Sequence, residues 1–136
     1  MKIEVRYYTK TGNTKKLADA IAEEVGVEAM PITIPISTET DILFLGSSVY
    51  AAEIDPQVKK FISSLDGRVK KVVSFSTAAM YQCAYRQVKK HVKAQGIKVD
   101  DEEFHCRGQF KFMHKGKPDS KDISAVKEFA KRIVSK

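Results

Sequence analysis

The sequence contains only two cysteines, Cys83 and Cys106, among its 136 residues. Two cysteines are too few for a disulfide scaffold, and neither belongs to a Cys-x-x-Cys pair, so we expect reduced thiols in a cytoplasmic protein. No apolar run approaches the roughly 20 residues that a membrane-spanning helix needs, so we expect no membrane insertion. Charged residues alternate with apolar ones in the first six positions, a pattern that is not typical of a signal peptide.

Repeats, low-complexity segments and linkers are also missing from the sequence. Apolar residues make up 43% of the chain and charged residues 30%, a composition typical of a folded protein. A chain of this size buries roughly two thirds of its unfolded surface when it folds, which is enough for a core of its own. We therefore expect a single domain over residues 1–136.

The charge is unevenly distributed along the chain. The formal net charge is +7, yet residues 1–68 carry 8 basic and 10 acidic side chains, whereas residues 69–136 carry 16 basic and 7 acidic ones. A basic half of this kind can attract an acidic protein, an anionic ligand or nucleic acid, and an ordinary solvated face also explains it.

Segments that favour strands alternate with segments that favour helices. Runs rich in β-branched and aromatic residues predict strands at residues 2–8, 27–32, 42–45, 69–75 and 97–104. Apolar residues at helical spacing predict helices at residues 13–25, 56–66, 82–95 and from 120 onward, with Asp55 and either Asp119 or Ser120 as N-terminal caps. This alternation predicts a doubly wound α/β fold, with a five-stranded parallel sheet in the order 2-1-3-4-5 and helices on both faces.

Ligands of such sheets bind at the carboxyl ends of the strands, beside strand one. Three predicted loops meet there: residues 9–14, 46–55 and 76–81. The first loop places hydroxyl groups and a glycine at the start of a helix, where backbone N–H groups and the helix dipole favour an anion. Because it matches neither the Walker A motif nor G-x-G-x-x-G, a terminal phosphate monoester fits it best, with simple helix capping as the alternative.

The same loop matches the phosphate loop of the flavodoxin family, Ser/Thr-x-Ser/Thr-Gly-x-Ser/Thr. Thr9, Thr11, Gly12 and Thr14 occupy its four fixed positions, and the sequence resembles that family over nearly its whole length. Residues 45–50, Leu-Gly-Ser-Ser-Val-Tyr, are similar to the family's strand-three exit, which leads to an aromatic residue beside the flavin. Residues 76–81 are similar to the loop that passes the other flavin edge.

The resemblance implies one non-covalently bound FMN and the transfer of electrons between redox partner proteins. The implied phosphate site consists of Thr9, Lys10, Thr11, Gly12, Asn13 and Thr14. The implied flavin-ring site consists of Ser48, Val49, Tyr50, Ala51, Ala52, Ser76, Thr77, Ala78 and Tyr81. Tyr50 and Tyr81 are the stacking candidates, although Tyr81 also has the spacing of a core residue on a helix face. We expect neither a catalytic residue nor a metal ligand.

Some features depart from the family's pattern. Flavodoxins are usually acidic, whereas this chain is basic, and the third loop lacks the acidic residue often found there. Residues 51–54, Ala-Ala-Glu-Ile, are similar to the corresponding loop of flavodoxin-like enzymes, among them the oxygen-independent protoporphyrinogen oxidases. Three hypotheses therefore stand: an electron carrier, an FMN-dependent oxidoreductase for a small or quinone- or porphyrinogen-like substrate, and a flavodoxin-like domain without its cofactor.

The basic residues also bear on the partner. The mixed basic and aromatic segment 107–117 is more typical of a loop packed on the sheet edge than of nucleic-acid binding. We expect redox partner proteins, an acidic one first, or an anionic substrate, and no nucleic acid.

Overall fold

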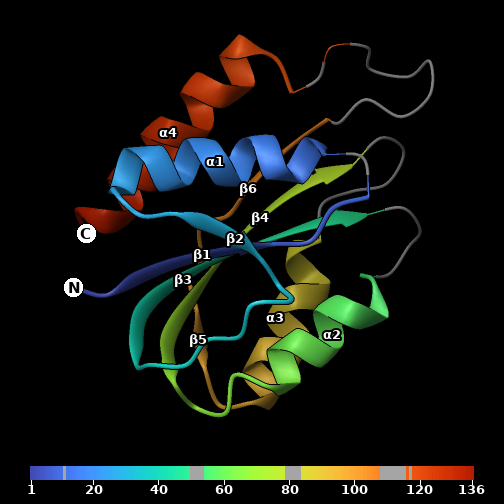
Figure 1. Ribbon diagram of the computed structural model, residues 1–136, viewed down its shortest axis with the longest axis vertical. Coiled ribbons are helices and arrows are strands. Elements are labelled where there is room, and N and C mark those ends of the chain that lie inside the picture. The colour runs from blue at the N-terminus through green and yellow to red at the C-terminus, as the bar shows by residue number, and fades with distance from the viewer. Residues whose placement is uncertain (11, 50–53, 79–83, 108–115, 117) are drawn as a thin grey trace.

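A parallel sheet lies between two pairs of helices in the computed structural model, which describes residues 1–10, 12–49, 54–78, 84–107, 116 and 118–136 (Figure 1). One face is covered by α1 (Asn13–Val25) and α4 (Ser120–Val134), and the other by α2 (Pro56–Ser63) and α3 (Tyr85–Ala94). The strands are β1 (Ile3–Tyr7), β2 (Ala29–Pro31), β3 (Thr40–Val49), β4 (Val69–Ala78), β5 (Lys98–Val99) and β6 (Phe104–Arg107). Their order is β2-β1-β3-β4-β5, β6 also pairs with β4, and every pairing is parallel, so the predicted doubly wound fold is confirmed.

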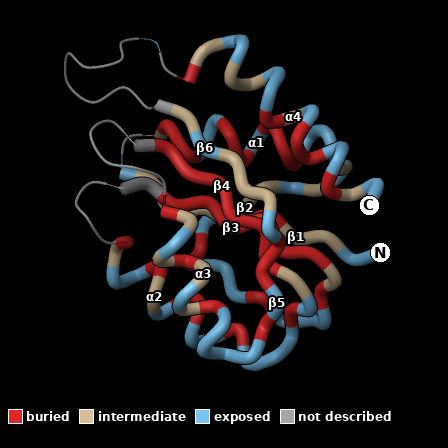
Figure 2. Tube along the Cα trace, turned by 180° about the vertical axis from the view of Figure 1, so that it is seen from behind, coloured by how far each residue is buried: buried red, intermediate tan, exposed pale blue. Residues whose placement is uncertain are grey.

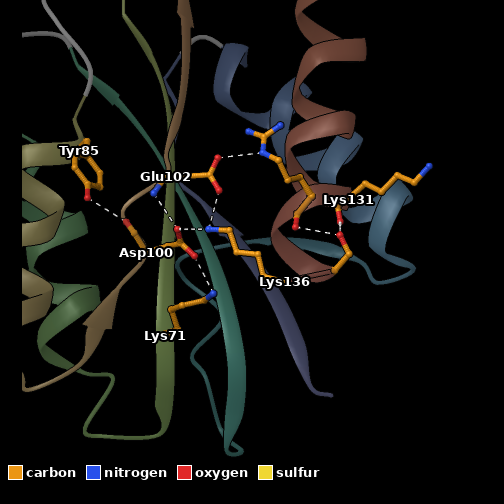
Figure 3. Close-up of polar contacts among 8 residues, drawn as sticks. Lys71, Tyr85, Asp100, Glu102, Lys131 and Lys136 are labelled. Atoms are coloured by element: carbon orange, nitrogen blue, oxygen red, sulfur yellow. Dashed lines mark hydrogen bonds and ion pairs between the residues drawn. The ribbon is translucent and has the colours of Figure 1, made fainter.

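The fifth position of the sheet is shared by two short strands, and the single strand predicted at 97–104 is therefore wrong in its bounds. Val99 of β5 pairs with Val72, and Phe104 of β6 pairs with Phe75. Between these two pairings, four residues of the edge chain, 100–103, face only two residues of β4, 73 and 74, and the extra residues form a bulge. The bulge contains Asp100, whose carboxylate is buried and held by lysines from other elements (Figure 3).

The core lies on both sides of the central strands, which are buried along most of their length (Figure 2). On β3, Leu43 and Leu45 pack towards α2 and α3, while Phe44 packs towards α1 and α4. All three side chains are fully buried, and each such side chain contributes roughly 1.5–3 kcal/mol of hydrophobic free energy. The continuous apolar run that predicted this strand is the expected pattern for a strand covered on both faces.

Two helices, α2 and α4, begin where their capping residues predict. Asp55 accepts a hydrogen bond from the N–H of Gln57 (2.9 Å), with Pro56 at the first helical position of α2. Asp119 and Asp122 form a reciprocal capping box at the start of α4. The bounds predicted for α1 are confirmed, whereas the predicted start of α3 near residue 82 lies outside the described residues. None of the helices described here is long and apolar enough to cross a membrane.

Candidate functional site at the carboxyl edge of the sheet

The loop between β1 and α1 turns tightly at Gly12. This residue has φ +87°, a left-handed conformation that glycine adopts without strain, and its N–H donates to Oγ1 of Thr9 (3.0 Å). Helix α1 begins at the next residue, Asn13, and its first turn contains no acidic side chain. The positive end of the helix dipole is therefore not neutralised within this turn, which favours an anion at the loop.

Thr14 connects this loop to the end of β4. Its Oγ1 lies 2.9 Å from Oγ1 of Thr77, and both side chains are buried. Thr77 in turn pairs in register with Ser48 near the end of β3. Residues that belong to all three predicted loops are thereby brought to one edge of the sheet.

Gly46 allows a close approach between β3 and its neighbours. A Cβ atom at this position would overlap the ring carbons of Phe75 and lie 2.9 Å from Cγ2 of Thr14. The fully buried Phe75 ring thus lies against the backbone of β3, beneath the first turn of α1. Gly46 and Phe75 support the candidate phosphate loop from below, although neither was predicted as a binding residue.

Serine side chains line the opposite face of the same strand ends. Ser47 and Ser76 are register partners on β3 and β4, and both are fully buried. Oγ of Ser76 accepts a hydrogen bond from the N–H of Ala84 (3.3 Å), whereas Oγ of Ser47 has no hydrogen-bond partner in the described part of the chain. A buried hydroxyl without a partner costs about 1–3 kcal/mol of stability, which marks Ser47 as a candidate binding residue. Ser47 was not among the residues predicted from the sequence. Its position directly before the predicted Ser48 was the available signal.

The start of α2 closes the site on the side of β1. The hydroxyl of Tyr8 accepts a hydrogen bond from Nε2 of Gln57 (3.4 Å). Nζ of Lys10 lies 3.7 Å from a carboxylate oxygen of Asp55. The exit of β1 is therefore joined to the N-terminus of α2 as well as leading into α1.

The predicted site residues that the structure describes all lie at this edge. Thr9, Lys10, Gly12, Asn13 and Thr14 form the first loop and the start of α1, Ser48 and Val49 end β3, and Ser76, Thr77 and Ala78 end β4. Thr11, Tyr50, Ala51, Ala52 and Tyr81 lie outside the described residues. Within the described ranges, no group of three or more His, Cys, Asp or Glu side chains is arranged to hold a metal ion. The donor set consists mainly of neutral hydroxyl groups at a helix N-terminus, which suits a phosphate group.

The fold and this edge together define a flavodoxin-like protein. A model of the flavodoxin domain family matches residues 4–115, and the chain belongs to that family. The resemblance inferred from the sequence is thereby confirmed. Membership supports a flavin-binding electron-transfer protein.

Known relatives span nearly the whole chain. An uncharacterized protein of Methanocaldococcus jannaschii is 28% identical in sequence, and the match covers 90% of this chain and 90% of that one. Among solved structures, a flavodoxin from the domain Archaea superposes with a TM-score of 0.81 at 20% identity, covering 99% of this chain and 97% of that one. Oxidised flavodoxin 1 from Bacillus cereus gives 0.76 at 18% identity, covering 99% and 98%.

A larger protein contains a similar fold. Rubredoxin oxygen:oxidoreductase from Desulfovibrio gigas superposes with a TM-score of 0.77 at 15% identity. The match covers 98% of this chain but 35% of that one. The same fold thus occurs both in chains of about this length and as part of a longer chain.

Proposed function

We propose that the protein binds one FMN non-covalently at the carboxyl edge of the sheet and carries electrons between redox partner proteins. The observation that supports this most directly is the start of α1. The helix begins directly after the glycine of a threonine-rich loop, has no carboxylate in its first turn, and is joined through Thr14 to the end of β4.

The residues present fit the phosphate group of FMN. A phosphate monoester is anionic and accepts hydrogen bonds, and this loop offers the positive end of a helix dipole together with hydroxyl donors. Lys10 adds a positive charge at the rim, although it is largely exposed and lies near Asp55. We assign Thr9, Lys10, Thr11, Gly12, Asn13 and Thr14 to the phosphate.

The strand ends and the two following loops would hold the flavin ring. Ser48 and Val49 end one strand, and Ser76, Thr77 and Ala78 end its neighbour, so the ring would lie beyond two adjacent strands. Tyr50, Ala51, Ala52 and Tyr81 complete the proposal, with the two tyrosines stacking on the ring. FMN supplies the redox chemistry when bound, and the chain's own residues bind it, orient it and exclude water from it.

Retention of the flavin tests this proposal. Purified protein is mixed with excess FMN, separated from free FMN by gel filtration and examined by visible absorption. A retained and perturbed flavin spectrum is the expected result. Riboflavin, which lacks the phosphate, should bind about 100-fold or more weakly, because two hydrogen bonds to a charged group are worth about 3 kcal/mol or more. Equal affinity for FMN and riboflavin would show that the loop does not bind the phosphate. A colourless protein would overturn FMN binding itself.

A turnover assay separates the carrier from an enzyme. The FMN-loaded protein is incubated with a nicotinamide donor and a quinone, without a partner reductase. We expect no sustained turnover, because a carrier receives its electrons from a partner protein. Steady turnover by the protein alone would instead favour an FMN-dependent oxidoreductase that acts on a small or quinone- or porphyrinogen-like substrate.

A further inference from the structure

The two helical faces of the molecule differ sharply in charge. The helices α2 and α3 contain no aspartate or glutamate, yet they carry six cationic side chains: Lys59, Lys60, Arg86, Lys89, Lys90 and Lys93. On the opposite face, cations and carboxylates of α1 and α4 are mixed and paired. Lys15 lies 2.7 Å from Asp19, for example, and Lys127 lies 3.0 Å from Glu23.

Half of these six cations are exposed lysines that no described carboxylate neutralises. Lys60, Lys90 and Lys93 are exposed, and none of them forms an ion pair with any carboxylate in the described ranges. Among the described residues, the carboxylates nearest in sequence are Asp55 and Asp66 on either side of α2 and Asp100 after α3. Asp55 caps α2 and lies near Lys10, and Asp100 is paired with Lys71 and Lys136. Because α2 and α3 contact each other, the potentials of their cations add over one continuous surface.

The basic surface extends from the edge that carries the proposed FMN site to the far ends of the two helices. Arg86 lies in the first turn of α3, whereas Lys60 and Lys93 lie in the last turns of α2 and α3. Both helices begin at the carboxyl edge of the sheet, the edge at which α1 also begins (Figure 1). The first turns of α2 and α3 contain no acidic side chain, and of their two N-cap residues only Asp55 is a carboxylate. The positive ends of the helix dipoles therefore add to the charge of the lysines. The two helices have eight and ten residues and are therefore about 12 and 15 Å long. A protein that covers this whole face would also reach the carboxyl edge and the flavin.

We propose that the exposed face of α2 and α3, defined by the six cationic residues above, docks an acidic redox protein beside the flavin site. The inference rests on the proposed function, because it names the partner of that site. Charge complementarity of this kind steers association and orients the two proteins before electron transfer.

The face favours a protein partner over a single-stranded nucleic acid. Single-stranded nucleic acids are held by exposed aromatic rings as well as by cations. The aromatic side chains of these two helices are turned inward: Phe61 is buried in the core, and the half-buried Tyr85 donates its hydroxyl to the carbonyl oxygen of Asp100 (3.0 Å). The face therefore offers charge without a stacking platform.

Paired charge reversals test the proposal. The variant Lys60→Glu/Lys90→Glu changes one exposed lysine on each helix of the basic face. The control Lys121→Glu/Lys131→Glu changes two exposed lysines of α4 on the other face. Each lowers the formal net charge of +7 by four units, so any difference between them reports position and not total charge. The probe is rubredoxin, a small acidic iron protein.

Binding is measured first, with fluorescently labelled rubredoxin in low and high salt, because this readout needs no FMN. In low salt the face variant should bind about tenfold or more weakly than the wild type, and the control within about twofold. The difference should vanish at about 1 M salt, where charges are screened within about 3 Å. Equal loss in both variants, or in neither, overturns the proposed surface. Preferential loss of binding to a single-stranded oligonucleotide, with rubredoxin binding unchanged, would overturn the choice of partner.

Electron transfer is measured second, with FMN-loaded protein that has been reduced by dithionite and desalted. The ferric iron of rubredoxin accepts one electron from the reduced protein and becomes ferrous, which is followed by absorption. The second-order rate should fall about tenfold in the face variant and remain near wild type in the control. Failure to retain FMN would overturn the proposed function while leaving the binding result valid, so the two failures are distinguishable.

Discussion

The side-chain oxygens of Thr14 and Thr77 lie 2.9 Å apart in buried positions, although 63 residues separate them in the sequence. Thr14 belongs to the first turn of α1, and Thr77 lies near the end of β4. The contact holds the proposed phosphate loop against the strand that leads to the proposed flavin-ring loop. The two ends of the proposed site are therefore mechanically connected.

A double-mutant cycle should detect this connection. Thr14→Val and Thr77→Val should each lower the free energy of unfolding by about 1 kcal/mol or more, because each removes the buried hydrogen bond between these two side chains. The double variant should lose less than the sum, which gives a coupling energy of about 1 kcal/mol in urea denaturation. Strictly additive losses would show that the two hydroxyls do not stabilise each other. Thr14→Ser keeps the hydroxyl and is the matched control.

Substitution of Gly46 should disturb the same region from below. In Gly46→Ala the new methyl group overlaps the Phe75 ring, which is fully buried and cannot move away freely. We expect a loss of about 1–3 kcal/mol in unfolding free energy, the usual range for overpacking. Replacing the ring by a smaller side chain should relieve the overlap. The loss caused by Gly46→Ala should therefore be smaller when it is added to Phe75→Leu than when it is made in the wild type. A neutral Gly46→Ala would mean that the strand tolerates the extra methyl group.

Much of the fold could be predicted because local signals and tertiary packing agree. The apolar spacing of Leu17 and Ile21 predicted α1, and the Asp55-Pro56 pair predicted the start of α2. The edge of the sheet was harder, because β5 and β6 are interrupted by an acidic stretch whose conformation depends on lysines from β4 and the C-terminal end of the chain. No local pattern near Asp100 encodes those partners.

The site was predictable only where the chemistry is local. A threonine-rich loop before a helix is visible in the sequence, and it led to Thr9, Gly12 and Thr14. The contacts of Gly46 with Phe75 depend on the register of two parallel strands, which hydrophobicity alone does not specify. The unpartnered hydroxyl of Ser47 is likewise a property of the packed structure.

Two substitutions of Asp55 should separate its cap from its ion pair. Asparagine is as good an N-cap as aspartate, so Asp55→Asn should stay within about 0.5 kcal/mol of the wild type. Asp55→Ala removes the hydrogen bond to the Gln57 N–H and should cost about 1 kcal/mol. The pair with Lys10 is expected to matter little, because Lys10 is exposed and 3.7 Å away. Urea denaturation measures both variants, and equal losses would instead assign the stability to the charge.

The buried carboxylate of Asp100 should make the protein less stable in acid. Burial by itself raises the pKa of this group, but hydrogen bonds from Lys71 (2.8 Å), the Glu102 N–H (2.9 Å) and Lys136 (2.9 Å) outweigh it (Figure 3). The pKa is thereby lowered from 3.8 to about 2. A group whose pKa is lower in the folded state stabilises the fold above its unfolded pKa, so this contribution is present above about pH 4 and is lost as the pH falls towards about 2.

Asp100→Asn should therefore flatten the acid limb of the stability curve. At neutral pH the variant should lose about 1–3 kcal/mol, because the hydrogen bonds to a charged carboxylate are replaced by weaker ones. Its deficit relative to the wild type should shrink as the pH falls below about 4, where the wild-type carboxylate begins to be protonated. Urea denaturation from neutral pH down to the lowest pH at which the fold persists measures the difference. Asp101→Asn, which removes the neighbouring exposed carboxylate, should follow the wild-type curve. A constant deficit for Asp100→Asn across the whole range would show that the stability it provides does not come from its charge.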